Sequence, residues 1–178
     1  MARSFTAIPG AVLLLCLFLP AMRVCNEPAL PITFPPCYAA YAGGIGVIVM
    51  ALARGRRALA FGAAMPPTLA VLTVGGCVAL SNSAAAPFVA NATLWLAVMV
   101  PVSIVRRVPS ERAMAGIAML QGLGATAWSA LLVSDKDGMW GAAITLVAGI
   151  VLVLSAATWL DATARHPQLP RAHTIVQR

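Results

Sequence analysis

Charged and titratable side chains are scarce in this sequence. Of its 178 residues only 10% are Asp, Glu, Lys or Arg, whereas 61% are hydrophobic, and charged residues make up about 25% of an ordinary soluble domain. The mean hydropathy of +0.90 agrees with this bias. The composition excludes a typical water-soluble fold and predicts a single domain whose solvent is lipid.

The polar groups that membrane chemistry needs are also missing from the apolar segments. No Asp, Glu, Lys, Arg or His lies well inside them, which argues against proton relays, ion-coupled carriers and voltage sensors. Both histidines, His166 and His173, lie near the C-terminus. We therefore expect no haem ligation, no Ser–His protease, no His-dependent acyltransferase, no intramembrane metal site and no cofactor.

Long apolar runs, by contrast, are abundant. Six of them approach the ~20 residues that a helix needs to cross a hydrocarbon layer of ~30 Å. Continuous apolar runs favour helices over a membrane barrel, whose strands would alternate. The sequence thus predicts an all-α integral membrane domain over residues 1–162, with short loops and six transmembrane helices at approximately 5–22, 37–53, 58–80, 87–105, 113–133 and 139–160.

The basic residues occupy alternate gaps between these runs. Of the 12 Lys and Arg residues, only Arg23 and Lys136 fall in the other set of gaps. This positive-inside pattern predicts cytoplasmic N- and C-termini. We expect residues 163–178 to form a flexible basic cytoplasmic tail. Because the cations cluster at helix ends, the net charge of +7 indicates topology and contact with anionic lipid, not nucleic-acid binding.

Composition also indicates the source membrane. Arginine greatly outnumbers lysine and alanine is abundant, which fits a GC-rich bacterial genome and hence the inner (plasma) membrane. The first apolar run is either a cleaved signal peptide or a retained helix. No small-x-small cleavage site follows it, and Arg23 stands where a lipoprotein signal ending at Cys25 needs a small residue. We therefore expect a retained first helix.

Cys25 and Cys37 form the sharpest candidate pair. Both lie in the first outward-facing gap, separated by a stretch with four prolines that cannot be helical. A structural disulfide across this loop would stabilise the fold by about 3 kcal/mol. Two unpaired thiols are the alternative, and a catalytic redox pair is disfavoured because the spacing is not Cys-x-x-Cys.

Gln121 is the single strong hydrogen-bonding side chain at mid-depth of an apolar run. An amide there either bridges two helices, for about 0.6–2 kcal/mol, or contacts a solute. Pro66, Pro67 and Pro101 interrupt two other runs. Such breaks either kink ordinary membrane helices or mark a binding site, and residues 58–65 either span the membrane or lie at its interface.

Close-packing faces without any charge-relay group favour a non-enzymatic structural or accessory subunit of a membrane complex. Its partners would be the lipid bilayer and a membrane protein or a second copy of the chain. The alternative is a small carrier or channel for a neutral or apolar solute. A membrane enzyme with a site on the outer loops would need Glu27, Asp135 or Asp137 as acid or base.

Overall fold

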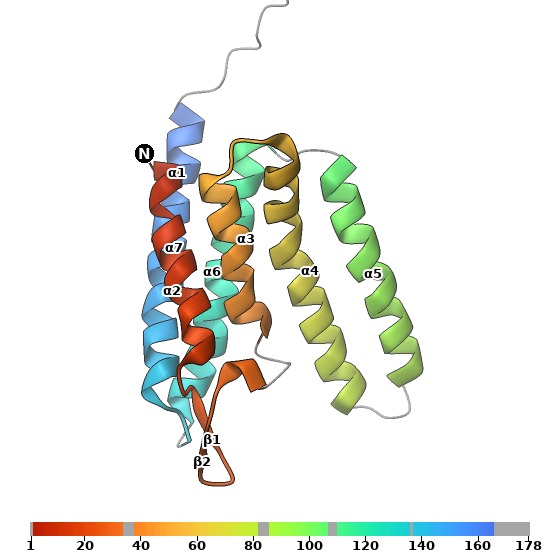
Figure 1. Cartoon of the computed structure of the whole chain (residues 1–178), viewed down its shortest axis with the longest axis vertical. Helices are drawn as coiled ribbons and strands as arrows, with labels where there is room; N and C mark the ends of the chain where they lie inside the picture. The colour runs from red at the N-terminus through yellow and green to blue at the C-terminus, as the bar shows by residue number, and fades with distance from the viewer. Residues whose placement is uncertain (1, 34–37, 82–85, 107–109, 136, 166–178) are drawn as a thin grey trace, which may run out of the picture.

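Helices account for almost all of the computed structural model, which describes residues 2–33, 38–81, 86–106, 110–135 and 137–165. The longer helices lie side by side, roughly parallel or antiparallel (Figure 1). In chain order they are α1 (Ala2–Phe5), α2 (Ala7–Leu15), α3 (Tyr38–Leu52), α4 (Arg56–Ser81), α5 (Ala86–Arg106), α6 (Glu111–Ser134) and α7 (Trp140–Arg165). The predicted all-α class is confirmed apart from one small hairpin.

Among the described residues, four helices are long and apolar enough to cross a membrane, namely Arg56–Ala79, Ala86–Arg106, Glu111–Ser134 and Trp140–Arg165. The other two apolar helical stretches, Ala2–Phe18 and Ala40–Leu52, are shorter. At ~1.5 Å per residue, the 15 residues of α3 cover about 22 Å of a ~30 Å hydrocarbon layer. All six predicted runs thus contain helix, but length alone qualifies only four of them as spans.

The first helical stretch ends earlier than predicted. A short 3-10 turn, η1 (Cys16–Phe18), follows α2, and Leu19 is extended with φ −101° and ψ 141°. Pro20 is the cause, because the residue before a proline is pushed out of the helical region. The predicted span 5–22 is therefore wrong at its C-terminal end, where the chain enters a hairpin instead.

This hairpin consists of two antiparallel strands, β1 (Met22–Val24) and β2 (Glu27–Ala29). The turn residues Cys25 and Asn26 have positive φ angles of 53° and 68°, as a type I′ turn requires. The rest of the proline-rich stretch, after β2, contains one short helical element among its described residues, the 3-10 turn η2 (Pro31–Thr33).

Backbone hydrogen bonds attach the hairpin to the turn between α6 and α7. Arg23 N donates to Asp137 O over 2.9 Å, and Met139 N donates to Ala21 O over 3.0 Å. The edge of β1 is thereby partly covered, which satisfies backbone groups that an open strand would leave unpaired. Two segments more than a hundred residues apart in the sequence form one end of the molecule.

The helix α4 runs without interruption through Pro66 and Pro67. The neighbouring helix α3 supports this turn, because Gly46 lets the Pro66 ring and Gly62 O approach closely: a Cβ at position 46 would lie 2.6 Å from each. Residues 58–65 thus belong to the same helix as the residues after the prolines, and whether they span the membrane or lie at its interface stays a prediction.

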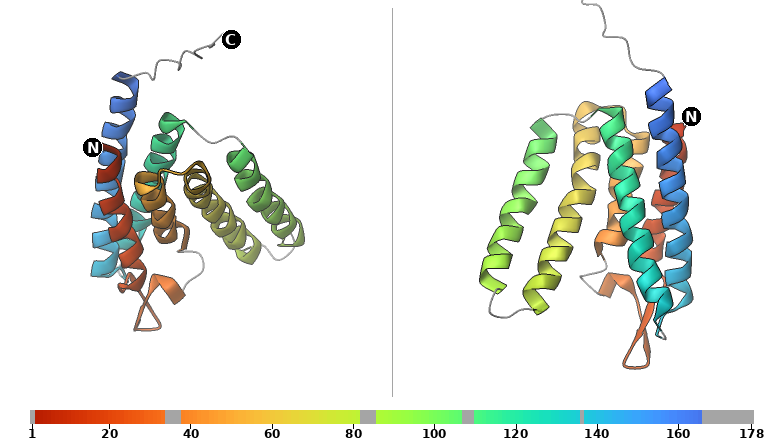
Figure 2. Two further views of the ribbon diagram at one scale, coloured as in Figure 1. Left: turned by 45° about the horizontal axis from the view of Figure 1, so that its top comes forward. Right: turned by 180° about the vertical axis from the view of Figure 1, so that it is seen from behind.

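The helices divide into a central bundle and an outlying pair. In the bundle, α2, α3, α6 and α7 enclose buried side chains that include Leu13, Val47, Leu152 and Trp159. The helix α4 packs on α3, and α5 packs on α4 at the edge of the molecule (Figures 1 and 2).

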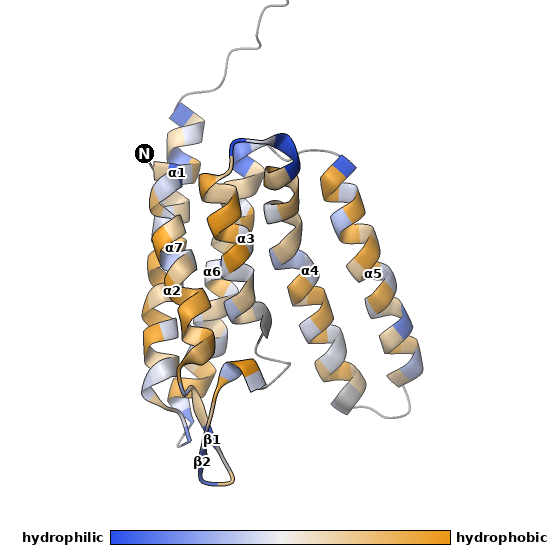
Figure 3. Ribbon diagram, viewed as in Figure 1, coloured by the Kyte–Doolittle hydropathy of each residue, from blue (hydrophilic) through white to orange (hydrophobic). Residues whose placement is uncertain are grey.

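The two ends of the molecule differ in charge. The arginine end holds the α3–α4 turn, the start of α6, the ends of α5 and α7, and the described arginines Arg3, Arg54, Arg56, Arg57, Arg106, Arg112 and Arg165. The hairpin end holds β1, β2 and the α6–α7 turn. Hydrophilic residues gather towards these ends, and the helices between them are mainly hydrophobic (Figure 3).

Candidate functional site

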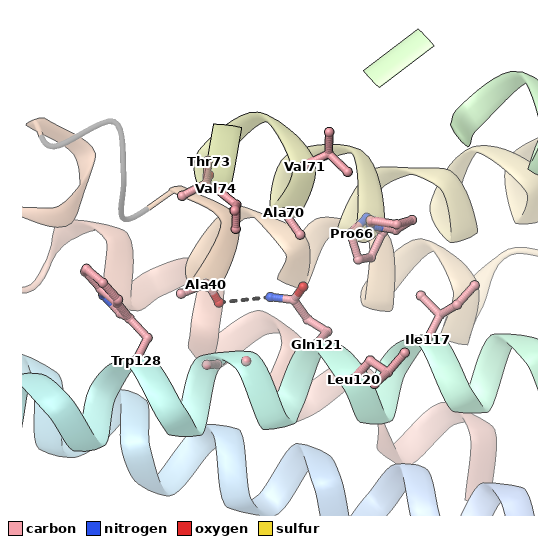
Figure 4. Close-up of a pocket in the computed structure, with 13 residues that line it drawn as sticks. Ala40, Pro66, Ala70, Val71, Thr73, Val74, Ile117, Leu120, Gln121 and Trp128 are labelled. Atoms are coloured by element: carbon pink, nitrogen blue, oxygen red, sulfur yellow. Dashed lines mark hydrogen bonds between the residues drawn. The ribbon is translucent and has the colours of Figure 1, made fainter. Parts of the chain in front are cut away.

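An apolar cavity of about 500 Å³ lies between α4 and α6 and is partly open to the surroundings (Figure 4). Its volume falls within the range of about 300–1,000 Å³ that is usual for small-molecule sites. No lining residue is charged. The lining residues are Ala40 of α3, Pro66, Pro67, Ala70, Val71, Thr73 and Val74 of α4, and Ile117, Leu120, Gln121, Gly124, Ala125 and Trp128 of α6.

Small residues on α6 leave the space open. A Cβ atom added to Gly124 would meet no atom within 4 Å, so this position faces a void. Ile117, Gln121, Gly124 and Trp128 recur at spacings of three and four residues, which places them on one face of the helix. At ~1.5 Å per residue this face extends about 16 Å along the helix axis, roughly half of a hydrocarbon layer.

Gln121 borders the cavity and also ties α6 to α3. Its Nε2 donates to the backbone oxygen of Ala40 over 3.0 Å (Figure 4), and the residue is 8% exposed. The amide lies against Gly43, where an added Cβ would clash with all three terminal atoms of Gln121. The two roles expected for this residue therefore coincide in space: it bridges two helices, and it lines a cavity that a solute could occupy.

Trp128 lines the cavity towards the hairpin end. Its ring also packs against the buried cluster of Cys16, Leu17 and Tyr41. The indole Nε1 is buried and has no hydrogen-bond partner in the part of the chain that the structure describes. Leaving such a donor unsatisfied costs roughly 1–3 kcal/mol.

The predicted proline sites separate into two places. Pro66 and Pro67 line the cavity together with Gln121, whereas Pro101 lies inside α5 and is not among the lining residues. The separation follows from the packing of α5 on the outer side of α4. Gly124 and Trp128 were missed as site residues, although their helical spacing from Gln121 places them on its face.

The predicted cysteine pair is described only in part. Cys25 is exposed at the hairpin turn and forms no disulfide with another described cysteine. Cys37 lies outside the described residues, so its pairing with Cys25 stays a prediction. The outer-loop carboxylates Glu27, Asp135 and Asp137 are exposed at the hairpin end.

At the opposite end, Arg3 of α1 caps the C-terminal end of α3. Its Nε donates to Met50 O over 2.9 Å, and its Nη2 donates to Ala53 O. A cation is favourable at the carbonyl end of a helix. Glu111, at the start of α6, lies 3.9 Å from Nη1. Together with the buried Leu13 of α2, these contacts integrate the first helical stretch into the bundle.

The described residues contain no group of three or more His, Cys, Asp or Glu side chains that could hold a metal ion. Fold and site together define an all-α chain with four helices of membrane-crossing length and an apolar cavity beside α6. No family model, no curated protein and no solved structure matches it. The geometry of the chain itself is therefore the basis for a functional proposal.

Proposed function

We propose that the chain is a six-span protein of the bacterial inner membrane, with the arginine end in the cytoplasm. The support is the gathering of seven described arginines at one end of the molecule, together with the start of α1 and the last turn of α7, since cytoplasmic loops carry an excess of Lys and Arg. The two shorter helices would complete their spans by local thinning of the bilayer and through the extended residues next to them.

Within that membrane, the proposed role is that of a non-enzymatic accessory subunit, and α5 carries this proposal. None of its residues is buried, although its 21 residues make a membrane-length helix. It packs on α4, where Thr93 lies so close to Gly75 that no Cβ would fit. The side chains of Phe88 and Trp95 remain 79% and 59% exposed.

A second membrane protein is the occupant that suits this face. Helices in lipid associate by close packing and by interhelical hydrogen bonds. The exposed face of α5 offers both large aromatic side chains and, at Asn91, an exposed amide on a mainly apolar helix. An amide at this position gains most from a neighbouring helix that can accept or donate a hydrogen bond.

Site-specific photo-crosslinking in living cells tests the role. A photoreactive amino acid replaces Trp95 on α5, and the matched control replaces Leu154 on α7, because these side chains are 59% and 62% exposed. We expect one protein adduct of defined mass at position 95 and none at position 154. Adducts at neither position, or the same adducts at both, would overturn the proposal. An adduct of twice the chain mass would assign the face to a second copy and remove the accessory role.

A carrier for a neutral or apolar solute is the second candidate function, and the partly open cavity favours it. Flux of such a solute into proteoliposomes is the direct measurement. Gly124→Leu should abolish the flux by filling the cavity. Gly116→Leu is the matched control, because an added Cβ at either glycine meets no atom within 4 Å. It should leave the flux unchanged, since Gly116 does not line the cavity. Equal flux in both variants would exclude transport through the cavity.

A further inference from the structure

The apolar cavity beside α6 is longer than it is wide. Its lining on α6, from Ile117 to Trp128, extends about 16 Å along the helix axis at ~1.5 Å per residue. A volume of about 500 Å³ over this length corresponds to a mean cross-section of about 30 Å². Hydrocarbon chains in contact lie about 4–4.5 Å apart, so one chain needs a cross-section of about 20 Å². The cavity therefore has the dimensions of a flexible hydrocarbon chain that lies along the helices.

The interior of the cavity accepts only an apolar group. No charged side chain lines it, and a charged group inside it would lose its hydration without gaining a counter-ion. The cavity is partly open, and the two helices that form most of its lining, α4 and α6, are apolar and of membrane-crossing length (Figure 4). In a bilayer the surrounding medium is hydrocarbon, so a lipid chain would enter sideways without crossing a polar surface.

Three exposed arginines without a counter-ion lie where α4 begins. Arg54, Arg56 and Arg57 form no ion pair with a described residue. The two acidic side chains at the arginine end, Glu111 and Asp161, pair with other arginines. The first turn of α4 contains no acidic residue either, although the N-terminus of a helix favours negative charge. This turn therefore leaves a cationic patch that only an anion from outside the described chain would neutralise.

Arg56 lies on the same face of α4 as the cavity lining. It precedes the lining residue Val74 by 18 residues, which is five full turns at 3.6 residues per turn. The lining begins at Pro66, about 15 Å further along the helix at ~1.5 Å per residue. Half of a bilayer with its headgroups measures about 20–22 Å. A lipid whose phosphate lies at Arg56 thus extends its chains past Pro66 and into the cavity.

We infer that the chain binds an anionic phospholipid here, with the phosphate beside Arg54, Arg56 and Arg57 and one acyl chain in the cavity. Guanidinium groups pair well with phosphate oxygens, and the apolar lining suits the chain. The inference rests on the membrane placement proposed above. It deepens the second candidate function by naming a ligand class for the same cavity, but it concerns binding and does not require transport.

Photolabelling of the full chain in lipid vesicles tests the site. Two probes carry the same diazirine on one acyl chain, one a phosphatidylglycerol and the other a phosphatidylcholine, and mass spectrometry locates the labelled peptides. We expect the phosphatidylglycerol probe to label the 117–128 segment about fivefold more strongly. The helix α5, which has no buried residue, is the internal reference and should be labelled equally by both probes. Equal labelling of the 117–128 segment would overturn the inference.

Gly124→Leu tests whether the chain occupies the cavity. The leucine side chain would fill the space that is open at Gly124, so the enhanced label on the 117–128 segment should disappear while the label on α5 stays. Gly116→Leu is the control and should keep the enhanced label, because its Cβ also meets no atom within 4 Å and Gly116 does not line the cavity. Enhanced label that persists in Gly124→Leu would overturn the cavity as the binding site.

Arg56→Gln tests the headgroup contact and leaves the cavity unchanged. The loss of one arginine beside an anionic lipid should lower the preference for the phosphatidylglycerol probe about fivefold. Arg112→Gln is the matched control, because Arg112 is also an exposed arginine in the first turn of a helix. Its Nη2 donates to Thr163 O of α7 over 3.5 Å, so this variant should retain the preference. Equal losses in both variants would overturn the contact with Arg56.

The outcomes separate this inference from the functions proposed above. Specific labelling without solute flux would support the inference and remove the carrier function. Flux that depends on Gly124 without preference for the anionic probe would overturn the inference and leave the carrier function in place. Labelling in vesicles does not depend on which end of the chain faces the cytoplasm, so the proposed orientation stands or fails by a separate measurement in cells.

Discussion

Introducing a methyl group at Gly43 should destabilise the bundle through Gln121. In the native structure the Gln121 amide lies directly on Gly43, and its Nε2 donates to Ala40 O over 3.0 Å. The Cβ of Gly43→Ala would occupy the position of that amide. The side chain must then swing away, which breaks the bond between α3 and α6.

The size of the effect follows from two terms. Overpacking at a close helix contact costs about 1–3 kcal/mol, and an interhelical hydrogen bond in a membrane contributes about 0.6 kcal/mol on average and at most ~1.7. Gly43→Ala should therefore lower the free energy of unfolding by roughly 1.6–4.7 kcal/mol. Gln121→Ala should cost about 0.6–1.7 kcal/mol, because it removes the bond without a clash.

The double variant shows whether the loss of stability comes from the contact between Gly43 and Gln121 or from a general sensitivity of the bundle to substitution. In the Gln121→Ala background the space of the amide is empty, so Gly43→Ala should cost less than about 0.5 kcal/mol, and the coupling energy between the two substitutions should be at least about 1 kcal/mol. Reversible unfolding of the four proteins in mixed micelles measures it. Gly116→Ala is the control, because its Cβ meets no atom within 4 Å. Additive losses would refute the contact.

Other positions give independent expectations. Gly149→Ala should cost about 1–3 kcal/mol of unfolding free energy, because its Cβ would lie 2.9 Å from Thr126 N across the α6–α7 interface; an unchanged unfolding midpoint would contradict that interface. Arg3→Gln should lower the free energy of unfolding by about 1.5–3 kcal/mol, because the charge-assisted hydrogen bonds to the carbonyls at the end of α3 are lost. Glu111→Gln should lower it by less than ~1 kcal/mol, because the ion pair with Arg3 is long and partly exposed. Equal losses would be inconsistent with capping. Mass spectrometry of the unreduced protein should find Cys25 linked to Cys37, and free thiols at both would exclude the disulfide.

Much of the fold could be predicted from the sequence because long apolar runs favour one backbone conformation. Apolar runs of sufficient length must form helices, and the four longest runs do so with boundaries close to those predicted. Gly122 and Gly149 face each other across α6 and α7: a Cβ at either would lie 3.1 Å from the carbonyl oxygen of the other, as small residues at helical spacing permit. These features are local or periodic, which is why a single sequence reveals them.

The remaining features depend on contacts between distant segments. Residue pattern gave no sign that Ala21 would pair with Met139, or that the proline-rich gap would include a hairpin, because strand pairing is a long-range choice. The close approach of α4 to α3 at Pro66 requires Gly46 of α3, which the sequence alone does not pair with it. The cavity likewise results from how α4 and α6 diverge, so Gly124 reads in the sequence only as one more small residue.

The most direct test of the account is the placement of its two ends on opposite sides of one membrane. In a cysteine-free background, Gly55→Cys marks the arginine end and Asp135→Cys the hairpin end, and both positions are exposed. A membrane-impermeant maleimide applied to spheroplasts should label position 135, and should reach position 55 only after permeabilisation. Labelling of both positions from the same side would contradict the proposed threading and, with it, the membrane placement of the cavity.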